Sequence, residues 1–295
     1  MKHNNPPTTI KLTVDKVPLR AGLYLVGTPI GYLKDISLRA LETFMSVDFV
    51  ACEDTRVTGK LLHHYGIPTK KIKYNDHSNL RARDNIINII EQGQSVALCS
   101  DAGLPLIADP GYKLVAECVE KGLYVTSIPG ANAALTGLQL SAMPTDQFIF
   151  LGFLATKKKA REDYLKRWKD VPVTQVYYES ARRIVDSIRA VQTVMGERHV
   201  VVARELTKSY EEVLSGTCSE LIDRLEAKPI KGEVVFIVSG EGDVKELNDE
   251  DILEQLRCEI HTQGHSAKEA VRIVMDQSGW PKKKVYEHAL TVKNE

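Results

Sequence analysis

The chain has 295 residues and no net charge, with 39 lysines and arginines against 39 aspartates and glutamates. This length suits two domains with an appendage, and near-average contents of 43% hydrophobic and 26% charged residues exclude a mostly disordered chain. The zero balance excludes a protein that is polybasic along its whole length, but it allows a local basic patch.

The cysteines and the N-terminus indicate the compartment. Five cysteines without a CxxC motif argue against a disulfide framework or structural zinc, and they favour a reducing cytosol. Residues 1–20 are polar and lack the apolar core of a signal peptide, and no run approaches the roughly 18 apolar residues of a membrane span. We expect a cytoplasmic protein with no membrane segment and no metal, beginning with a flexible tail over residues 1–20.

From Gly22, short apolar runs alternate with stretches of helical character. Alternation of this kind predicts a mostly parallel sheet covered on both faces, and therefore an α/β domain over residues 21–146. The expected strands are 23–26, 47–51, 71–74, 95–99 and 124–128, and the expected helices begin at Ser37 and cover 55–65, 80–92 and 111–121.

The sequence Met143-Pro-Thr-Asp146 breaks this rhythm, which then resumes over residues 147–241. Strands expected at 148–151, 173–178, 199–203 and 233–238, with helices at 182–194 and 218–225, predict a second, smaller α/β domain. Seven acids against Lys245 alone, between Glu241 and Glu254, mark the start of a third segment, 242–295. Its expected helices at 266–277 and 282–290 flank Gly279-Trp-Pro281, which is the outline of a helix-turn-helix.

Three loops rich in small residues follow predicted strands, at 27–31, 100–105 and 129–133. Ligands of open α/β sheets bind outside the carboxyl ends of the strands, and small residues let a ligand approach the backbone. One such loop is explained as a turn, but three at one edge favour a small-molecule site. The motifs GxxxxGK[ST], GxGxxG, HExxH and GxSxG are absent from the sequence, which disfavours nucleotide-binding, metalloprotease and esterase functions.

Charged residues form two further patterns. Glu53-Asp-Thr-Arg56, Glu179 with Arg182-Arg183, and Arg204-Glu205 follow predicted strands. A helix N-terminus explains the acids but not the arginines, which suit a phosphate partner. The stretch Lys157–Lys169 has seven bases and two acids, and Lys282–Lys284 form a second basic cluster. Each alone fits a solvated helix face, and together they favour contact with a nucleic-acid backbone.

The loops and clusters occur in one order that resembles a known family. The shared motifs are Leu25-Val-Gly-Thr-Pro-Ile-Gly31, Ala51-Cys-Glu-Asp-Thr-Arg56, Ser100-Asp-Ala-Gly103, Asp109-Pro-Gly-Tyr112, Tyr178-Glu-Ser180 and Ala203-Arg-Glu-Leu-Thr207. From about Gly22 to its end, the chain resembles the cytidine 2′-O-methyltransferases of 16S ribosomal RNA, in the tetrapyrrole methylase superfamily. It departs from their usual pattern at Leu104, in place of Thr, and at Ala131, in place of Pro.

This resemblance implies a class III methyltransferase fold: two α/β domains, with S-adenosylmethionine in the cleft between them, and a small helix-turn-helix module. It also implies a homodimer that methylates a cytidine ribose in the decoding region of 16S rRNA, within the small ribosomal subunit. The implied cofactor contacts are Gly27, Thr28, Pro29, Ile30, Gly31, Ser100, Asp101, Ala102, Gly103, Leu104, Ile107, Asn132, Ala133, Tyr178 and Glu179.

Methylation of a ribose hydroxyl requires a group that takes its proton, and no metal. The candidate bases, between which the sequence does not choose, are Glu53, Asp54, Asp101, Glu179 and Glu205. The candidate RNA contacts are Arg56, Arg182, Arg183, Arg204, Lys157, Lys158, Lys159, Lys282, Lys283 and Lys284. Two alternatives stay open: a tetrapyrrole methyltransferase, which does not account for the basic clusters, and a non-catalytic RNA-binding assembly factor that retains the cofactor fold.

Overall fold

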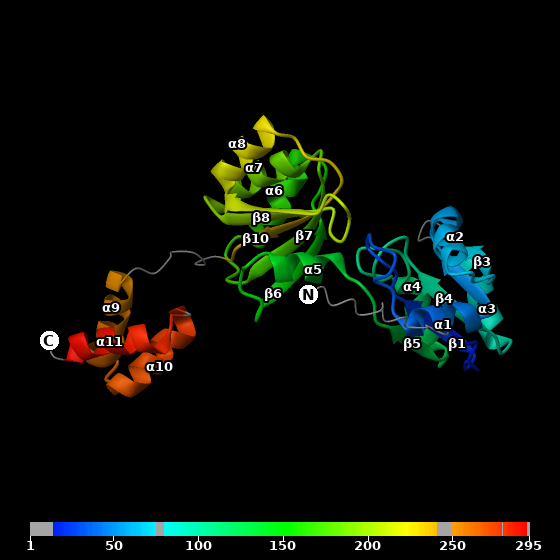
Figure 1. Ribbon diagram of the computed structural model, residues 1–295, viewed down its shortest axis with the longest axis horizontal. Helices are drawn as coiled ribbons and strands as arrows, with labels where there is room; N and C mark the ends of the chain where they lie inside the picture. Colours follow the sequence, from blue (N-terminus) through cyan, green and yellow to red (C-terminus); the bar gives the residue numbers. More distant parts are fainter. Residues whose placement is uncertain (1–13, 75–79, 241–248, 279, 294–295) are drawn as a thin grey trace, which may run out of the picture. The chain divides into compact units, whose positions relative to one another are not determined.

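The computed structural model describes residues 14–74, 80–240, 249–278 and 280–293. The chain divides into two compact units, Met1–Gly240 and Glu241–Glu295 (Figure 1). Residues 1–13 of the tail expected over residues 1–20 lie outside the described residues, as do most of the acidic stretch and Gly279 of the expected turn. Within the part that the structure describes, no helix is both long and apolar enough to cross a membrane.

The first sheet of the larger unit is fully parallel, as its sequence predicts, with strand order β3-β2-β4-β1-β5. All five residues of the central strand β4 are buried, which is the continuous apolar pattern of a strand covered on both faces. The strands are β1 (Gly22–Val26), β2 (Phe49–Cys52), β3 (Lys70–Lys73), β4 (Ser95–Cys99) and β5 (Val125–Ile128).

Four helices cover the two faces of this sheet. They are α1 (Leu38–Ser46), α2 (Thr55–His64), α3 (Leu80–Glu91) and α4 (Tyr112–Glu120). Consecutive residues of a strand point to opposite faces, so Leu23 packs in one apolar cluster with α3 and α4, while Tyr24 packs in the other with α1 and α2. The predicted N-cap Ser37 is confirmed, since its side chain accepts a hydrogen bond from the Ala40 amide.

The second sheet has the order β6-β7-β10-β8-β9 and is mostly antiparallel, because only β6 and β7 run parallel. The alternation of strands and helices predicts the second α/β domain correctly, but it does not show that most strands of this sheet are antiparallel. Residues 205–211 connect β8 and β9 as a hairpin, and the sequence of β9 has too few apolar residues to be detected as a strand. The strands are β6 (Phe148–Phe153), β7 (Thr174–Ser180), β8 (His199–Arg204), β9 (Glu212–Thr217) and β10 (Glu233–Val238).

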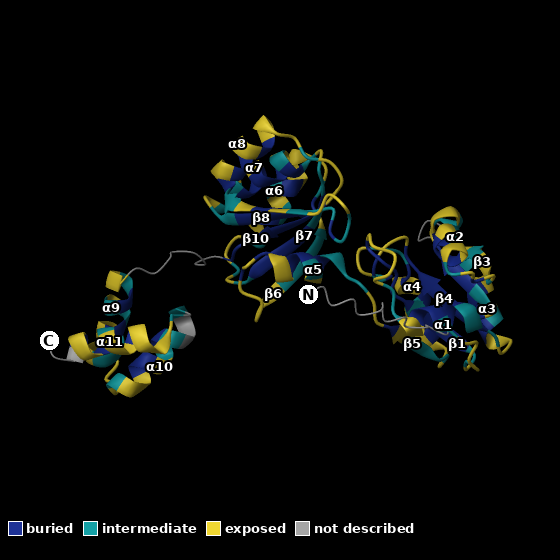
Figure 2. Cartoon of the chain, in the orientation of Figure 1, coloured by how far each residue is buried: buried dark blue, intermediate teal, exposed yellow. Residues whose placement is uncertain are grey.

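Helices also cover both faces of the second sheet, and its central strands are dark blue in Figure 2. One face packs against α6 (Lys158–Lys166), α7 (Ile184–Met195) and α8 (Cys218–Ala227). The other packs against α5 (Ala133–Leu140), a helix that the sequence did not predict. At Gly137 this helix lies so close to the sheet that a Cβ atom there would be 2.8 Å from a methyl carbon of Val235.

The smaller unit consists of α9 (Asp249–Arg257), the π-helical turn η1 (Cys258–Thr262), α10 (Ala267–Ser278) and α11 (Lys282–Lys293). Its apolar side chains form a core of their own, with Ile252, Leu256, Ala270, Val271, Val274, Val285, Ala289 and Val292 buried. Three acids in the first turn of α9 interact favourably with the positive end of the helix dipole. The expected helices of this segment are therefore confirmed, although α11 continues to Lys293.

Candidate active site

The three predicted loops meet at the carboxyl edge of the first sheet, where β4, β1 and β5 are neighbours. Thr28 and Gly103 form an isolated bridge: the Thr28 amide donates to the Gly103 carbonyl at 2.8 Å, and the reverse bond measures 3.1 Å. Gly27 approaches the third loop so closely that a Cβ there would lie 2.8 Å from the Gly130 Cα. Glycine is required at this contact because any side chain would separate the loops.

Some residues of these loops build the site without facing its cavity. The Thr28 hydroxyl is buried and lies 3.3 Å from the carbonyl oxygens of both Ser100 and Gly103, so it holds two loops together. Pro29 is also buried. Of the predicted cofactor contacts, Gly27, Thr28, Pro29, Gly31 and Ser100 are absent from the lining that the described residues provide.

A cavity of about 250 Å³ lies against these loops. It also takes residues from β7, β8, β10 and the loop before β9, so both sheets contribute to its wall. The other ten predicted cofactor contacts all line it, namely Ile30, Asp101, Ala102, Gly103, Leu104, Ile107, Asn132, Ala133, Tyr178 and Glu179. The lining residues that were not predicted include Asp109, Phe153, Lys208 and Glu233.

Two carboxylates in the segment between β4 and α4, which begins with the second loop, border the cavity. Asp101 is exposed, and its Oδ1 accepts a hydrogen bond from the Asp54 amide at 3.2 Å. Burial raises the pKa of Asp109 to about 6, against a hydrogen bond from Ser100 that lowers it, and the charges of Glu53 and Asp101 raise it further. Asp109 was not among the predicted bases, although the motif Asp109-Pro-Gly-Tyr112 contained it.

The backbone that leads to Asp109 is strained. Leu106 has a φ of 73° and Ala108 a φ of 61°, in the left-handed region that side chains other than glycine rarely adopt. Such residues gather at binding and catalytic sites, where the surrounding structure holds them. Neither Leu106 nor Ala108 carries a side chain that signals this geometry, so sequence reasoning could not find it.

Glu179 is a structural carboxylate in the cavity wall. It lies within β7 rather than after it, and it is 3% exposed. Arg183 forms an ion pair with its Oε1 at 2.5 Å, and the Ser187 hydroxyl donates to its Oε2 at 2.7 Å. The Ser180 amide also donates to Oε1 at 2.7 Å. A carboxylate with these three donors is already fully engaged, which disfavours a role as a proton acceptor.

Aromatic rings form another part of the wall. Phe153, at the end of β6, is 59% exposed, and its ring centroid lies 5.4 Å from that of Tyr178. Phe150 contacts the same tyrosine from the strand interior, with 4.8 Å between centroids. An exposed aromatic ring in a cavity wall offers a flat face for a heterocyclic base.

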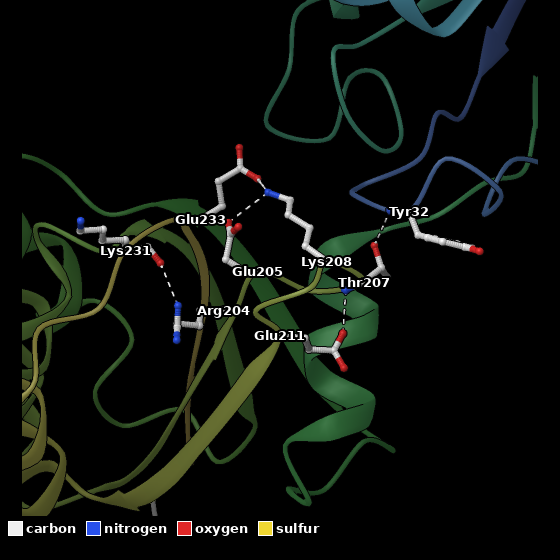
Figure 3. A network of polar contacts seen from close by, with 8 residues as sticks. All are labelled: Tyr32, Arg204, Glu205, Thr207, Lys208, Glu211, Lys231 and Glu233. Atoms are coloured by element: carbon white, nitrogen blue, oxygen red, sulfur yellow. Dashed lines mark hydrogen bonds and ion pairs between the residues drawn. The ribbon is translucent and has the colours of Figure 1, made fainter. Parts of the chain in front are cut away.

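Lys208 carries the cation of the cavity wall, and Figure 3 shows its contacts. Its Nζ lies 3.1 Å from Glu205 Oε1 and 2.8 Å from Glu233 Oε2. Burial opposes the charged lysine, but these hydrogen bonds outweigh it and raise the pKa of Lys208. Burial likewise opposes the charged form of Glu205, yet the Glu233 amide and Lys208 lower its pKa. In the same loop, the Thr207 hydroxyl accepts a hydrogen bond from the Tyr32 amide at 3.0 Å, joining the two sheets' loops.

The remaining predicted bases are outside the cavity lining. Glu53 is exposed after β2. Asp54 caps α2 by accepting from the Arg56 amide at 2.8 Å and pairs with the Arg56 guanidinium at 2.6 Å. The hydrogen bonds from Arg56 hold the pKa of Asp54 well below its usual range. Asp54 therefore caps α2, and its lowered pKa disfavours the predicted role as a base.

The sequence argument that the arginines lack a structural explanation is wrong for three of them. Arg56 pairs with Asp54, Arg183 with Glu179, and Arg204 Nε with Glu212 Oε2 at 2.8 Å. Arg204 also stands at a hairpin and not at a helix N-terminus. Arg182, by contrast, is exposed.

The lysine clusters lie on helix starts. Lys157, Lys158 and Lys159 are exposed at the beginning of α6, and Lys158 Nζ lies 3.9 Å from Glu162. Lys282 and Lys283 are exposed at the beginning of α11 in the smaller unit. Lys284 has a local partner there, since its Nζ is 4.8 Å from the centre of the Trp280 ring. Among the described residues, no three His, Cys, Asp or Glu side chains are grouped to hold a metal.

A family model and the sequences of known proteins both match this chain over most of its length. The model of the tetrapyrrole (corrin/porphyrin) methylases matches residues 22–222. The chain is 42% identical to "Ribosomal RNA small subunit methyltransferase I" of Halalkalibacterium halodurans, over 90% of this chain and 93% of that protein. Proteins of the same name from Mesorhizobium japonicum and Bacillus subtilis are 43% and 39% identical, over 94% and 90% of this chain and 94% and 92% of theirs.

Solved structures share the fold. A diphthine synthase superposes with a TM-score of 0.57 at 17% identity, over 74% of this chain and 89% of that chain. A cobalt precorrin-4 methyltransferase superposes with a TM-score of 0.55 at 16% identity, over 74% of this chain and 94% of that chain. The uroporphyrin-III C-methyltransferase of Thermus thermophilus, in complex with S-adenosylhomocysteine, superposes with a TM-score of 0.53 at 16% identity. The superposition covers 74% of this chain and 97% of that chain.

Proposed function

The chain belongs to the tetrapyrrole (corrin/porphyrin) methylase family, and we propose that it transfers a methyl group from S-adenosylmethionine to the 2′-hydroxyl of a cytidine in the decoding region of 16S rRNA. The observation that carries this proposal is the cavity at the three loops, which is lined by Gly103, by the carboxylates of Asp101 and Asp109 and by the exposed ring of Phe153. The names of the 39–43% identical relatives support ribosomal RNA as the acceptor.

The residues of the cavity fit this cofactor. Gly103, with a φ of 79°, leaves open a position where a Cβ would lie 3.3 Å from Ile30, so the backbone there is accessible to a ligand. Asp101 and Asp109 place negative charge at the same wall, which favours a positively charged ligand. When bound, the cofactor supplies an electrophilic methyl group on a sulfonium centre. Ala102, Gly103, Leu104, Asn132 and Ala133 would hold it.

We assign the base to Asp109. A carboxylate with a pKa of about 6 is ionised at neutral pH and still basic enough to accept a proton from a hydroxyl as it attacks. Asp54 and Glu205 are each bound to a cationic side chain that lowers the pKa of the carboxyl, which makes them weaker bases. The two oxygens of Glu179 are already engaged by Arg183, Ser187 and the Ser180 amide. Asp101 faces the cavity too and is the competing assignment.

We also propose that the protein is a homodimer. Leu135, Leu140 and Phe148 are large apolar side chains that the larger unit leaves exposed. Leu135 and Phe148 border a second cavity, of about 470 Å³, beside α5 and the start of β6. Exposed apolar groups of this kind mark protein interfaces, and light scattering of the purified protein measures the dimer directly.

The function is tested by incubating the purified protein with small ribosomal subunits that lack the modification and with labelled S-adenosylmethionine. We expect label in 16S rRNA, and mass mapping of nuclease fragments should place it on a cytidine ribose in the decoding region. Label on porphyrinoid precursors instead would favour a tetrapyrrole methyltransferase. Subunit binding without any transfer would favour an assembly factor.

A further inference from the structure

A third cavity of the larger unit, of about 330 Å³, lies on the side of the second sheet that α8 covers. We call it the basic groove and define it by Arg204, Tyr210, Arg224, Lys228 and Lys231, which line it. It shares no lining residue with the cavity of the candidate active site. Its floor is apolar, because the buried residues Leu214 and Leu225 form it.

The charge of the basic groove is unbalanced. Its one acid, Glu212, is already paired with Arg204. Arg224, Lys228 and Lys231 are exposed, and within the described ranges their side chains have no carboxylate within ion-pair distance. Three free cations around one hollow attract a polyanion rather than a single small carboxylate.

Tyr210 determines which polyanion fits. Its side chain is 75% exposed at the edge of the groove, and no hydrogen bond holds its hydroxyl in the part of the chain that the structure describes. An exposed ring beside cations is the combination with which proteins bind single-stranded nucleic acid, since unpaired bases stack on the ring and phosphates contact the cations. Double-stranded RNA and acidic peptides offer phosphate or carboxylate groups, but they leave the ring without a partner.

The basic groove adjoins the candidate active site along the chain. Ala203 lines the active-site cavity and the next residue, Arg204, lines the groove, because consecutive residues of β8 point to opposite faces. The hairpin loop contributes Lys208 to the cavity and Tyr210 to the groove. In Figure 3 the Arg204 guanidinium also contacts the Lys231 carbonyl, at 3.4 Å.

We propose that the basic groove binds a single-stranded RNA segment that flanks the methylated nucleotide, with a base stacked on Tyr210 and phosphates against Arg224, Lys228 and Lys231. This inference rests on the proposed function, because it names the surface that holds the RNA substrate at one end of the second sheet while the acceptor ribose enters the cavity.

The test uses the full-length protein and an unstructured, fluorescein-labelled RNA of about twelve nucleotides, a length within the usual site size of such grooves. Binding is followed by fluorescence anisotropy at several salt concentrations. Each phosphate contact on a single strand contributes about 0.7 to the salt slope. The triple change Arg224→Ala, Lys228→Ala, Lys231→Ala should therefore lower the slope by about 2.

Conservative variants are the matched controls. Arg224→Lys, Lys228→Arg, Lys231→Arg keeps the three charges and should keep the slope. Tyr210→Ala should weaken binding about 10-fold, whereas Tyr210→Phe, which keeps the stacking face, should bind like wild type. All of these side chains are exposed, so the variants should fold, and thermal melting checks this.

Unchanged slope and affinity in the triple and Tyr210→Ala variants would overturn the proposal. Equal competition by a duplex of the same sequence would remove the single-strand assignment, and equal competition by polyglutamate would reduce the groove to a general anion surface. Failure of the proposed function is distinguishable, because it appears as absent methyl transfer by the wild type, whatever the anisotropy results are.

Discussion

The candidate active site and the basic groove lie on opposite faces at the end of β8, yet they differ in charge. The wall of the first has the carboxylates of Asp101 and Asp109, together with the ion-paired residues Glu179, Lys208 and Glu233. The second has three exposed cations without carboxylate partners among the described residues. An acidic cavity repels phosphate and favours a sulfonium ligand. This difference in charge favours separate surfaces for the proposed chemistry and the proposed RNA binding, and the following experiments test that separation.

The largest expected effect comes from the proposed base. Asp109→Asn should lower the methyl-transfer rate about 10²- to 10⁴-fold, the usual contribution of a general base. The wild-type rate should rise with pH through about 6, as Asp109 ionises. Asp101→Asn is the matched control in the same segment, and it should lower the methyl-transfer rate less than Asp109→Asn does. If Asp101→Asn is the more damaging change, the base is Asp101.

The ionised carboxylate of Asp109 should lower the stability of the fold above about pH 6. Because burial raises the folded-state pKa of Asp109 above its unfolded value, its favourable contribution is present at low pH and is lost as pH rises through about 6. Asp109→Asn should therefore melt at a higher temperature than wild type at pH 8, with the difference shrinking towards pH 4. A lower melting temperature at pH 8 would contradict this account of its environment.

A buried ion pair supports the acidic wall. Arg183→Ala leaves the buried Glu179 without its cation and should destabilise the fold by about 3 kcal/mol. The neighbouring Arg182 is exposed, so Arg182→Ala should change the free energy of unfolding by less than about 0.5 kcal/mol. Urea denaturation measures both. Equal stability of the two variants would mean that Arg183 is free to act on RNA.

Access to the cavity depends on Gly103. Gly103→Leu should reduce S-adenosylmethionine affinity about 100-fold in calorimetry, because the new side chain meets Ile30 and occupies ligand space. Gly122→Leu is a matched control, since Gly122 has a similar positive φ, 67°, but nothing within 4 Å of its Cβ position. Unchanged affinity of Gly103→Leu would remove this loop from the binding site.

The smallest effect is expected at the exposed arginine of α2. Arg56 is 87% exposed and pairs with Asp54 outside the lining of the acidic cavity. Arg56→Ala should leave the melting temperature and cofactor affinity unchanged and should raise the KM for ribosomal subunits about 3-fold, the loss of one phosphate contact. A change in melting temperature with an unchanged KM would assign Arg56 to structure alone.

The sequence predicted the site best where backbone geometry required particular residues. The glycines and small residues of three loops indicated one shared site, and the structure joins these loops through Thr28 and Gly103. The second sheet was harder to predict, because β9 has only two strongly apolar residues and the hairpin before it carries no Asn-Gly signal. Pairing between distant residues also stayed hidden, since no local pattern shows that Arg204 meets Glu212.

The number of charged residues in a segment did not show which of them are exposed, buried or brought together by folding. Lysines at the start of α6 are exposed, as a basic RNA-contacting surface requires, whereas Arg161 of the same run is buried. The sequence did not indicate Asp109 as a base, because its raised pKa arises from burial in the folded structure. The basic groove combines residues from the hairpin, α8 and the loop before β10, which only folding brings together.

The separation of chemistry from RNA binding is tested most directly by steady-state methylation of small ribosomal subunits. The Arg224→Ala, Lys228→Ala, Lys231→Ala variant should raise KM and leave kcat unchanged, while Asp109→Asn should lower kcat and leave KM unchanged. A groove variant with a lower kcat at unchanged KM, or an Asp109→Asn variant with only a higher KM, would contradict the account.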